Sequence, residues 1–184
     1  MPEVARSIPD FLLCAARELT AEVGYSAMSM RQLATRVGLQ PGSLYHHVAS
    51  KQDLLLDVLL DIVERRIEAW RRGTYCRDLQ GYLRFALMCQ RTHPGDELLL
   101  RHDSRHLQPD QRNWLDQRLK LLRQPLLVAV EADINQGRFN VQDAGSVSEA
   151  ILALIDSADT LRRRAIPVDE TWIESWLMRM SLAL

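Results

Sequence analysis

Two histidines, a tyrosine and a lysine stand close together in one short segment, PGSLYHHVASKQDLL, at positions 41–55. Residues of these types hold metal ions, move protons in acid–base catalysis, or contact the bases and phosphates of DNA. His46 and His47 are adjacent, and neighbouring side chains on a helix point about 100° apart. The two rings are therefore poorly placed to chelate one ion, and we predict no metal site here.

A second cluster, RHDSRH, places His102 and His106 four residues apart with Asp103 between them. On a helix this spacing brings both imidazoles to one face, where they could share a metal ion. It leaves open an all-helical, metal-dependent enzyme that uses His102, Asp103 and His106. The sequence offers no identifiable third ligand, no phosphate-binding loop and no activated nucleophile, so a polar face or an effector contact is the favoured interpretation.

The composition is that of an ordinary globular protein. Of 184 residues, 47% are hydrophobic and 26% are charged, and the formal net charge is -1. Proteins that bind DNA without specificity rely on many cations, so the near-neutral charge argues against that alternative. Three dispersed cysteines (Cys14, Cys76 and Cys89) form no CxxC pair, and no apolar run is long enough to span a membrane. Because the N-terminus also lacks the layout of a signal peptide, we expect a cytoplasmic protein that does not bind membranes.

The elements that position these residues are predicted to be helices throughout. Glycine and proline are concentrated at segment boundaries, and no long stretch alternates with period two. Asp10 is expected to cap a first helix that has Phe11 and Leu12 on its apolar face and ends at Gly24. Further helices are expected at 29–38, from 41, and at 51–72, 78–91, 97–106, 109–136, 143–164 and 170–183, with a kink at Pro125.

Residues 30–48 have the layout of a helix-turn-helix. Leu33 and Leu44 are spaced to share one core, and the small side chain of Ala34 lets two helices cross closely. Gly38 suits the left-handed turn between the helices, because glycine adopts positive φ at least cost. The second helix of such a unit enters the major groove of DNA with its early residues at the base edges.

The segment GYSAMSMRQLATRVGLQPGSLYHHVASKQDLL, at positions 24–55, resembles the N-terminal domain of the TetR family of transcriptional regulators. The spacings of glycine, alanine, tyrosine, histidine and lysine all agree with the family, and the resemblance extends over Asp10–Leu59. Gln40 and Val48 depart from it, because Ser or Thr and Phe are common at these places. The turn at Gly137–Phe139 also resembles one that many members carry between two late helices.

The resemblance implies an all-α fold in which an N-terminal three-helix helix-turn-helix domain, residues 1–50, precedes a helical bundle for effector binding and dimerisation, residues 51–184. It implies a homodimer that binds a palindromic operator in double-stranded DNA, most simply a repressor released by a small-molecule effector of unknown identity. It implies no cofactor, no metal and no catalysis. The residues expected to contact DNA are Arg31, Gln40, Pro41, Ser43, Tyr45, His46, His47 and Lys51.

An effector pocket is expected among the aromatic and soft apolar side chains of the second domain, although an ordinary core is the alternative for each of them. Trp172, Trp176 and Met180 repeat every four residues and form either core or a dimer seam. The candidates for the pocket are Trp70, Tyr82, Phe85, Cys89, His102 and Trp114.

Overall fold

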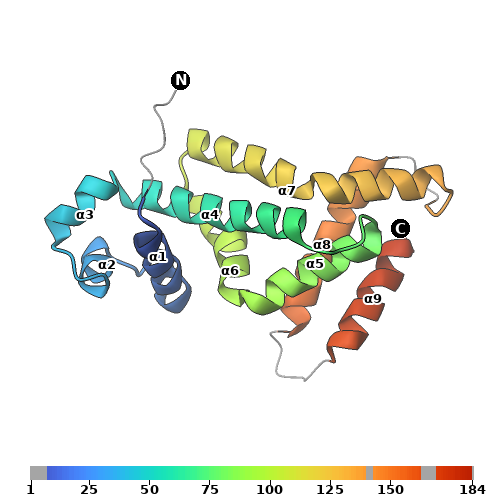
Figure 1. The fold of residues 1–184 in the computed structure, drawn as a ribbon, viewed down its shortest axis with the longest axis horizontal. Helices are drawn as coiled ribbons and strands as arrows, with labels where there is room; N and C mark the ends of the chain where they lie inside the picture. The colour runs from blue at the N-terminus through green and yellow to red at the C-terminus, as the bar shows by residue number, and fades with distance from the viewer. Residues whose placement is uncertain (1–7, 140–142, 163–168, 184) are drawn as a thin grey trace. The chain divides into compact units, whose positions relative to one another are not determined.

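The structure of the protein is a computed structural model that describes residues 8–139, 143–162 and 169–183. Every regular element in these ranges is helical, as predicted (Figure 1). The elements are α1 (Asp10–Val23), α2 (Met30–Arg36), α3 (Pro41–His47), α4 (Lys51–Arg72), α5 (Leu79–Thr92), α6 (Pro94–His102), the 3-10 helix η1 (Asp103–His106), α7 (Pro109–Asn135), α8 (Ala144–Arg162) and α9 (Glu170–Leu182).

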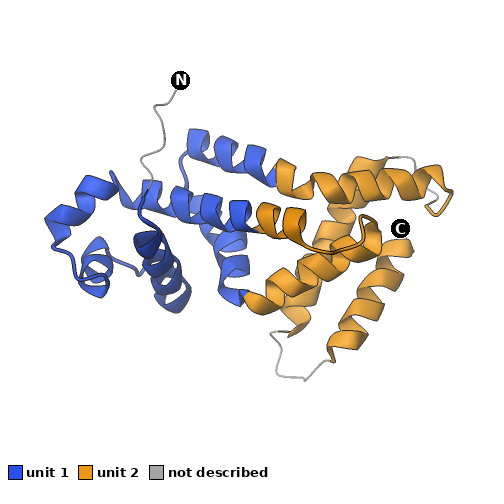
Figure 2. Ribbon diagram, in the orientation of Figure 1, with its two compact units in different colours: residues 1–65, 93–119 blue, residues 66–92, 120–184 orange. Residues whose placement is uncertain are grey.

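The chain divides into two compact units (Figure 2). Unit 1 comprises residues 1–65 and 93–119, and unit 2 comprises residues 66–92 and 120–184. Helices α4 and α7 contribute residues to both. Unit 1 therefore contains α6, η1 and the start of α7 in addition to the N-terminal helices, and a domain boundary at residue 50 stays a prediction.

The first helices of unit 1 begin and end at local signals that the sequence shows. Ser29 forms a capping box with Gln32: the Gln32 N–H donates to Ser29 Oγ at 3.1 Å, and the Ser29 N–H donates to Gln32 Oε1 at 2.8 Å. Gly38 has φ 70° in the turn that follows α2, and Pro41 is the first residue of α3. Ser50 caps α4 by accepting the Asp53 N–H at 3.1 Å. These boundaries confirm the predicted helix-turn-helix.

The core of unit 1 is aliphatic. Leu12 of α1, Leu33 of α2 and Leu44 of α3 are completely buried, as are Leu59 and Ile62 of α4. Burying each of these side chains contributes roughly 1.5–3 kcal/mol to folding. The three short helices therefore share one core, which fixes the direction in which the remaining face of α3 is presented.

Helix α6 packs against α1 within the same unit. A Cβ added at Gly95 would lie 2.9 Å from Ala21 Cβ, so the backbones approach closely at this point. Asp96 is buried and lies within ion-pair distance of Arg17 and of Arg65, at 3.9 and 3.3 Å. Asp61 lies 3.8 and 2.9 Å from the same two arginines. This four-residue charge network joins α1, α4 and α6.

In unit 2, α8 and α9 pack against each other and against α5. Ile151 of α8 and Ile173 of α9 are completely buried. Gln90 is also buried, and it donates through Nε2 to the Ile155 carbonyl at 2.8 Å and accepts from Arg162 Nη1 at 3.0 Å. A polar side chain in a core needs such partners, because an unpaired buried amide costs free energy.

The first helix corrects two expectations. The N-cap of α1 is Pro9, not Asp10, and Asp10 is the first helical residue. Phe11 does not belong to the core, because its side chain is 53% exposed.

Helix α6 corrects a third expectation. It begins at Pro94, three residues before the predicted start, because proline needs no N–H donor in the first turn and can open a helix as well as end one. The predicted helix at 97–106 is α6 followed by η1, and its last four residues are 3-10.

Among residues 8–139, 143–162 and 169–183, no helix is both long enough and apolar enough to cross a membrane. Nor do these residues contain a group of three or more His, Cys, Asp or Glu side chains arranged to hold a metal ion.

Candidate nucleic-acid interface

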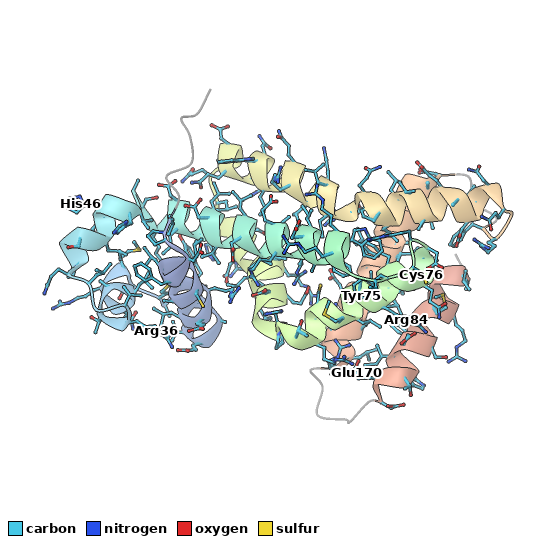
Figure 3. All side chains as sticks on the ribbon, viewed as in Figure 1. Arg36, His46, Tyr75, Cys76, Arg84 and Glu170 are labelled. Carbon is cyan, nitrogen blue, oxygen red and sulfur yellow. The ribbon has the colours of Figure 1, made fainter. Side chains whose placement is uncertain are left out.

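One face of α3 points to solvent while the other is buried. Leu44 and Val48 are 0% and 2% exposed, and they anchor the helix and its C-cap to the core. Tyr45 is 52% exposed, and His46 is exposed and projects from the outside of the helix (Figure 3). Of the other residues predicted to touch DNA in this segment, Gln40 and Pro41 are exposed, and Ser43 and His47 are half-buried.

Helix α2 supports α3 from behind. Ala34 is 1% exposed, so α2 contributes a small buried side chain where the two helices pack. Arg31 is exposed at the start of α2, as a residue that reaches a ligand must be. Arg36, also labelled in Figure 3, is instead engaged with α1, because its two Nη atoms donate to the carboxylate of Glu22 at 2.8 and 2.6 Å.

The charge of this region differs from that of the whole chain. Between Glu22 and Asp53 the sequence has no acidic residue, but it has Arg31, Arg36 and Lys51. Because Arg36 is paired with Glu22, the local positive charge of the helix-turn-helix surface comes from Arg31 and Lys51, although the formal net charge of the chain is -1. A local field of this kind attracts a polyanion without a basic overall composition.

Lys51 lies in the first turn of α4, as predicted, but its ammonium already has protein neighbours. Nζ donates to the Ser26 carbonyl at 3.4 Å and lies 4.3 Å from the centroid of the Tyr25 ring. Burial lowers the pKa of Lys51, while the nearby Asp103 carboxylate raises it. The hydrogen bond from Lys51 Nζ to the Ser26 carbonyl is long, and Lys51 is only half-buried. A phosphate can therefore replace this carbonyl as the partner of the ammonium.

The cluster His102, Asp103 and His106 lies in the same unit as these residues. The His106 ring is 4.9 Å from the Tyr25 ring between centroids, and its Nε2 lies 3.5 Å from Ser26 Oγ. Gln52 Nε2 donates to the His106 carbonyl at 3.1 Å. The structure thus brings η1 against the start of α4 and the turn after α1, and His106 is occupied by packing there. Tyr25 and Ser26 were missed by sequence reasoning.

Comparisons with known proteins identify the N-terminal helices. Residues 12–58 match the family model of bacterial regulatory proteins, tetR family. Over these residues the chain is similar to the tetR family. The HTH-type transcriptional regulator UidR of Escherichia coli K12 is 37% identical over 60 residues, which are 33% of this chain and 31% of UidR. The match thus spans about a third of that curated relative.

Solved structures extend the tetR-family likeness to the whole fold. A bacterial regulatory protein in the tetR family from Rhodococcus RHA1 superposes with a TM-score of 0.81 and 19% identity, over 98% of this chain and 96% of that one. AibR, solved in complex with isovaleryl coenzyme A and operator DNA, gives a TM-score of 0.77 and 19% identity over 92% and 95% of the two chains. At these identities the likeness shows the fold alone.

The residues predicted to line an effector pocket are distributed over both units of the chain. In unit 2, Tyr82 and Phe85 are buried, and their rings lie 5.6 and 5.2 Å from that of Trp70. Cys89 is also buried. His102 and Trp114 belong to unit 1 and are exposed. That all six share one pocket stays a prediction. Of the six, Trp70 lines a pocket within unit 2.

Proposed function

We propose that this protein is a DNA-binding transcriptional regulator of the tetR type that represses its target genes and is released from a palindromic operator by a small-molecule effector. The observation that supports the proposal most is the exposed face of α3, held on a buried core and surrounded by a stretch of sequence without acidic residues. The repressor assignment is supported by KstR2 of Mycolicibacterium smegmatis, a transcriptional repressor that is 35% identical over 74 residues, 34% of its length.

Each exposed residue of α3 has chemistry that suits a groove of DNA. Tyr45 and His46, with Gln40 and Pro41 at the start of the helix, would meet base edges or the adjacent sugars, through hydrogen bonds and contact with thymine methyl groups. Gly42 lets the backbone approach the groove, because it has no side chain to hold the helix away.

The remaining residues would fix the register of the protein on the duplex. Ser43 and His47 are half-buried and can donate to phosphate oxygens from a defined position, and Arg31 can reach a phosphate or a base from α2. Lys51 would hold a phosphate together with the free N–H groups at the start of α4.

A homodimer is part of the proposal. Trp172 and Met180 of α9 are 46% and 42% exposed, and Leu182 is 44% exposed. Trp172 and Met180 lie on one face of α9, with the Trp172 ring stacked on that of Trp176, and a contiguous apolar face of this kind is typical of a surface that a partner covers. A second copy of the chain would bury them and present two α3 helices to successive major grooves, which lie about 34–36 Å apart.

An effector acts on such a dimer by changing the populations of two states. It must bind the state that does not fit the operator more tightly than the state that does. AibR was solved with both isovaleryl coenzyme A and operator DNA, which supports placing both kinds of ligand on this fold. Because its target is DNA, we place the working protein in the bacterial cytoplasm, and we assign it no catalytic role.

The test is selection of bound duplexes from a random DNA pool by the purified protein. We expect enrichment of a palindrome whose half-sites are about one helical turn apart. Enrichment of no sequence by a protein with intact helical circular dichroism contradicts the proposal.

A further inference from the structure

Unit 2 contains a pocket of about 430 Å³ between the end of α4, the segment before α5 and the middle of α7. This volume is within the range of small-molecule sites in proteins. Most of its wall is apolar, and beside the indole N–H of Trp70 only two arginines and one glutamine carry polar groups. The lining residues are Ile67, Trp70, Leu121, Leu122, Pro125 and Val128, with Arg71, Arg77 and Gln124.

Arg77 is held rigidly at the edge of this pocket. Its guanidinium lies 4.5 Å from the centroid of the Trp70 ring and donates to the carbonyls of Trp70 and Arg71 at 2.8 and 3.2 Å. These acceptors are neutral carbonyl groups, so the positive charge of Arg77 is oriented without being neutralised. A planar cation stacked on an indole is a preorganised contact for a planar anion.

Arg71 contributes a second positive charge to the same lining. In the described part of the chain, its guanidinium has no hydrogen-bond or ion-pair partner. The acidic residue that precedes it on α4, Glu68, is paired with Arg72 at 2.5 Å. Among the described residues, neither Arg71 nor Arg77 therefore forms an ion pair with a carboxylate.

The apolar part of the wall is incompletely covered. Leu121 and Val128 are 51% and 52% exposed, and they lie on α7 together with the half-buried Pro125 between them. An apolar chain laid along this part of α7 would remove these side chains from water, which is favourable in proportion to the apolar area covered.

We propose that the pocket binds an amphipathic organic carboxylate, with the carboxylate between Arg71 and Arg77 and the apolar chain along Leu121, Pro125 and Val128. A carboxylate matches the fork of a guanidinium in two parallel hydrogen bonds, and an alcohol or an ammonium does not. The binding of this ligand does not depend on the proposed function. Its role as the effector does rest on that function.

The experiment is calorimetric titration of the full chain, without DNA, by octanoate, octanol and octyltrimethylammonium. The three probes have straight apolar chains of nearly equal length and differ in the head group, which is an anion, a neutral hydroxyl or a cation. We expect octanoate to bind at least about tenfold more tightly than octanol, since a hydrogen bond to a charged group is worth roughly 1.5–3 kcal/mol. Equal affinity for octanoate and octanol, or no binding of octanoate, overturns the proposal.

Variants locate the site. Arg71→Gln should weaken octanoate roughly tenfold or more and leave octanol unchanged. Arg72→Gln is the matched control, because Arg72 neighbours Arg71, is paired with Glu68 and does not line the pocket. An equal loss in both variants overturns the assignment of the head group.

Three further outcomes separate the ligand site from a dimer interface and from the proposed function. Loss of octanoate binding in Leu121→Glu together with conversion of a dimer into monomers would make the pocket a dimer interface and overturn the ligand site. If octanoate binds but does not release the protein from a selected operator duplex, the carboxylate site is supported and only its role as the effector site is contradicted. Operator binding by a protein that does not bind octanoate overturns the carboxylate site alone.

Discussion

Replacing Asp57 by asparagine should stabilise the protein at neutral pH. Asp57 lies on α4 and is half-buried, and burial raises the pKa of its carboxyl to about 6, with a further contribution from the charge of Asp53. Asp53 precedes it by one helical turn and accepts a hydrogen bond from Gln111 Nε2 at 2.7 Å. The negative charge of Asp57 is thus unfavourable in the folded protein.

The size and sign of the effect follow from the pKa. A rise from the ordinary value of 3.8 to about 6 is roughly two pKa units, and each unit corresponds to about 1.4 kcal/mol. The folded state binds the proton more tightly, so the protonated carboxyl favours folding below pH 3.8, and this contribution is lost as the pH rises through about 6. Ionised Asp57 therefore costs up to about 3 kcal/mol at neutral pH, and less where solvent screens it.

The assay is urea unfolding followed by circular dichroism, at about pH 7.5 and about pH 4.5. Asp57→Asn should raise the free energy of unfolding by about 1–3 kcal/mol at the higher pH and by much less at the lower pH. Asp116→Asn, which removes an exposed carboxylate from α7, is the matched control. A variant that is no more stable than the wild type at the higher pH, or that gains as much at the lower pH, refutes the reasoning.

Three further predictions concern the N-terminal helices. Lys51→Met should make the slope of log affinity against log salt concentration less steep, by the equivalent of about one phosphate contact per protomer. Titrations of an operator duplex at several salt concentrations measure this slope, and an unchanged slope would contradict the phosphate contact. Gly38→Ala should lower the free energy of unfolding in urea by about 1–2 kcal/mol, because a residue with a Cβ is strained at a φ of 70°. No steric clash adds to this cost, since the added Cβ meets nothing within 4 Å, and a neutral result would contradict a purely conformational role of Gly38. Ser29→Ala should cost about 1 kcal/mol in the same assay through loss of the capping box, with no cost expected for the exposed Ala27→Ser.

The ends of the short helices could be predicted because their signals are local. Ser29, Gly38, Pro41 and Ser50 each act on backbone groups within four residues, so a single sequence contains the whole interaction. The same locality made the start of α6 hard to predict. Pro94 and the glycine after it are compatible with a break or with a first turn, and the close packing of α6 on α1 was not visible in the sequence.

The contacts around Lys51 and around the pocket of unit 2 could not be predicted, because they join residues that are distant in the sequence or depend on backbone geometry. His106 meets Tyr25 and Ser26 across a large sequence separation, whereas the RHDSRH spacing by itself indicated only a polar face or an effector contact. Arg77 lies between the helices predicted at 51–72 and 78–91. It lines the pocket because Trp70 and three backbone carbonyls fix its guanidinium, and no pattern of residue types reveals such contacts.

The central claim is that α3 reads the DNA sequence, and its most direct test is a ratio of two affinities. The affinity for the selected palindrome is divided by that for a scrambled duplex of the same composition. Both are measured at one salt concentration, for the wild type and for Tyr45→Ala. Tyr45 is half-exposed and does not belong to the core, so the variant should keep its fold. We predict that the wild type discriminates by roughly a thousandfold or more and that Tyr45→Ala loses most of this ratio. A wild-type ratio near one, or a folded variant with an unchanged ratio, would contradict the account of α3 as the reading helix.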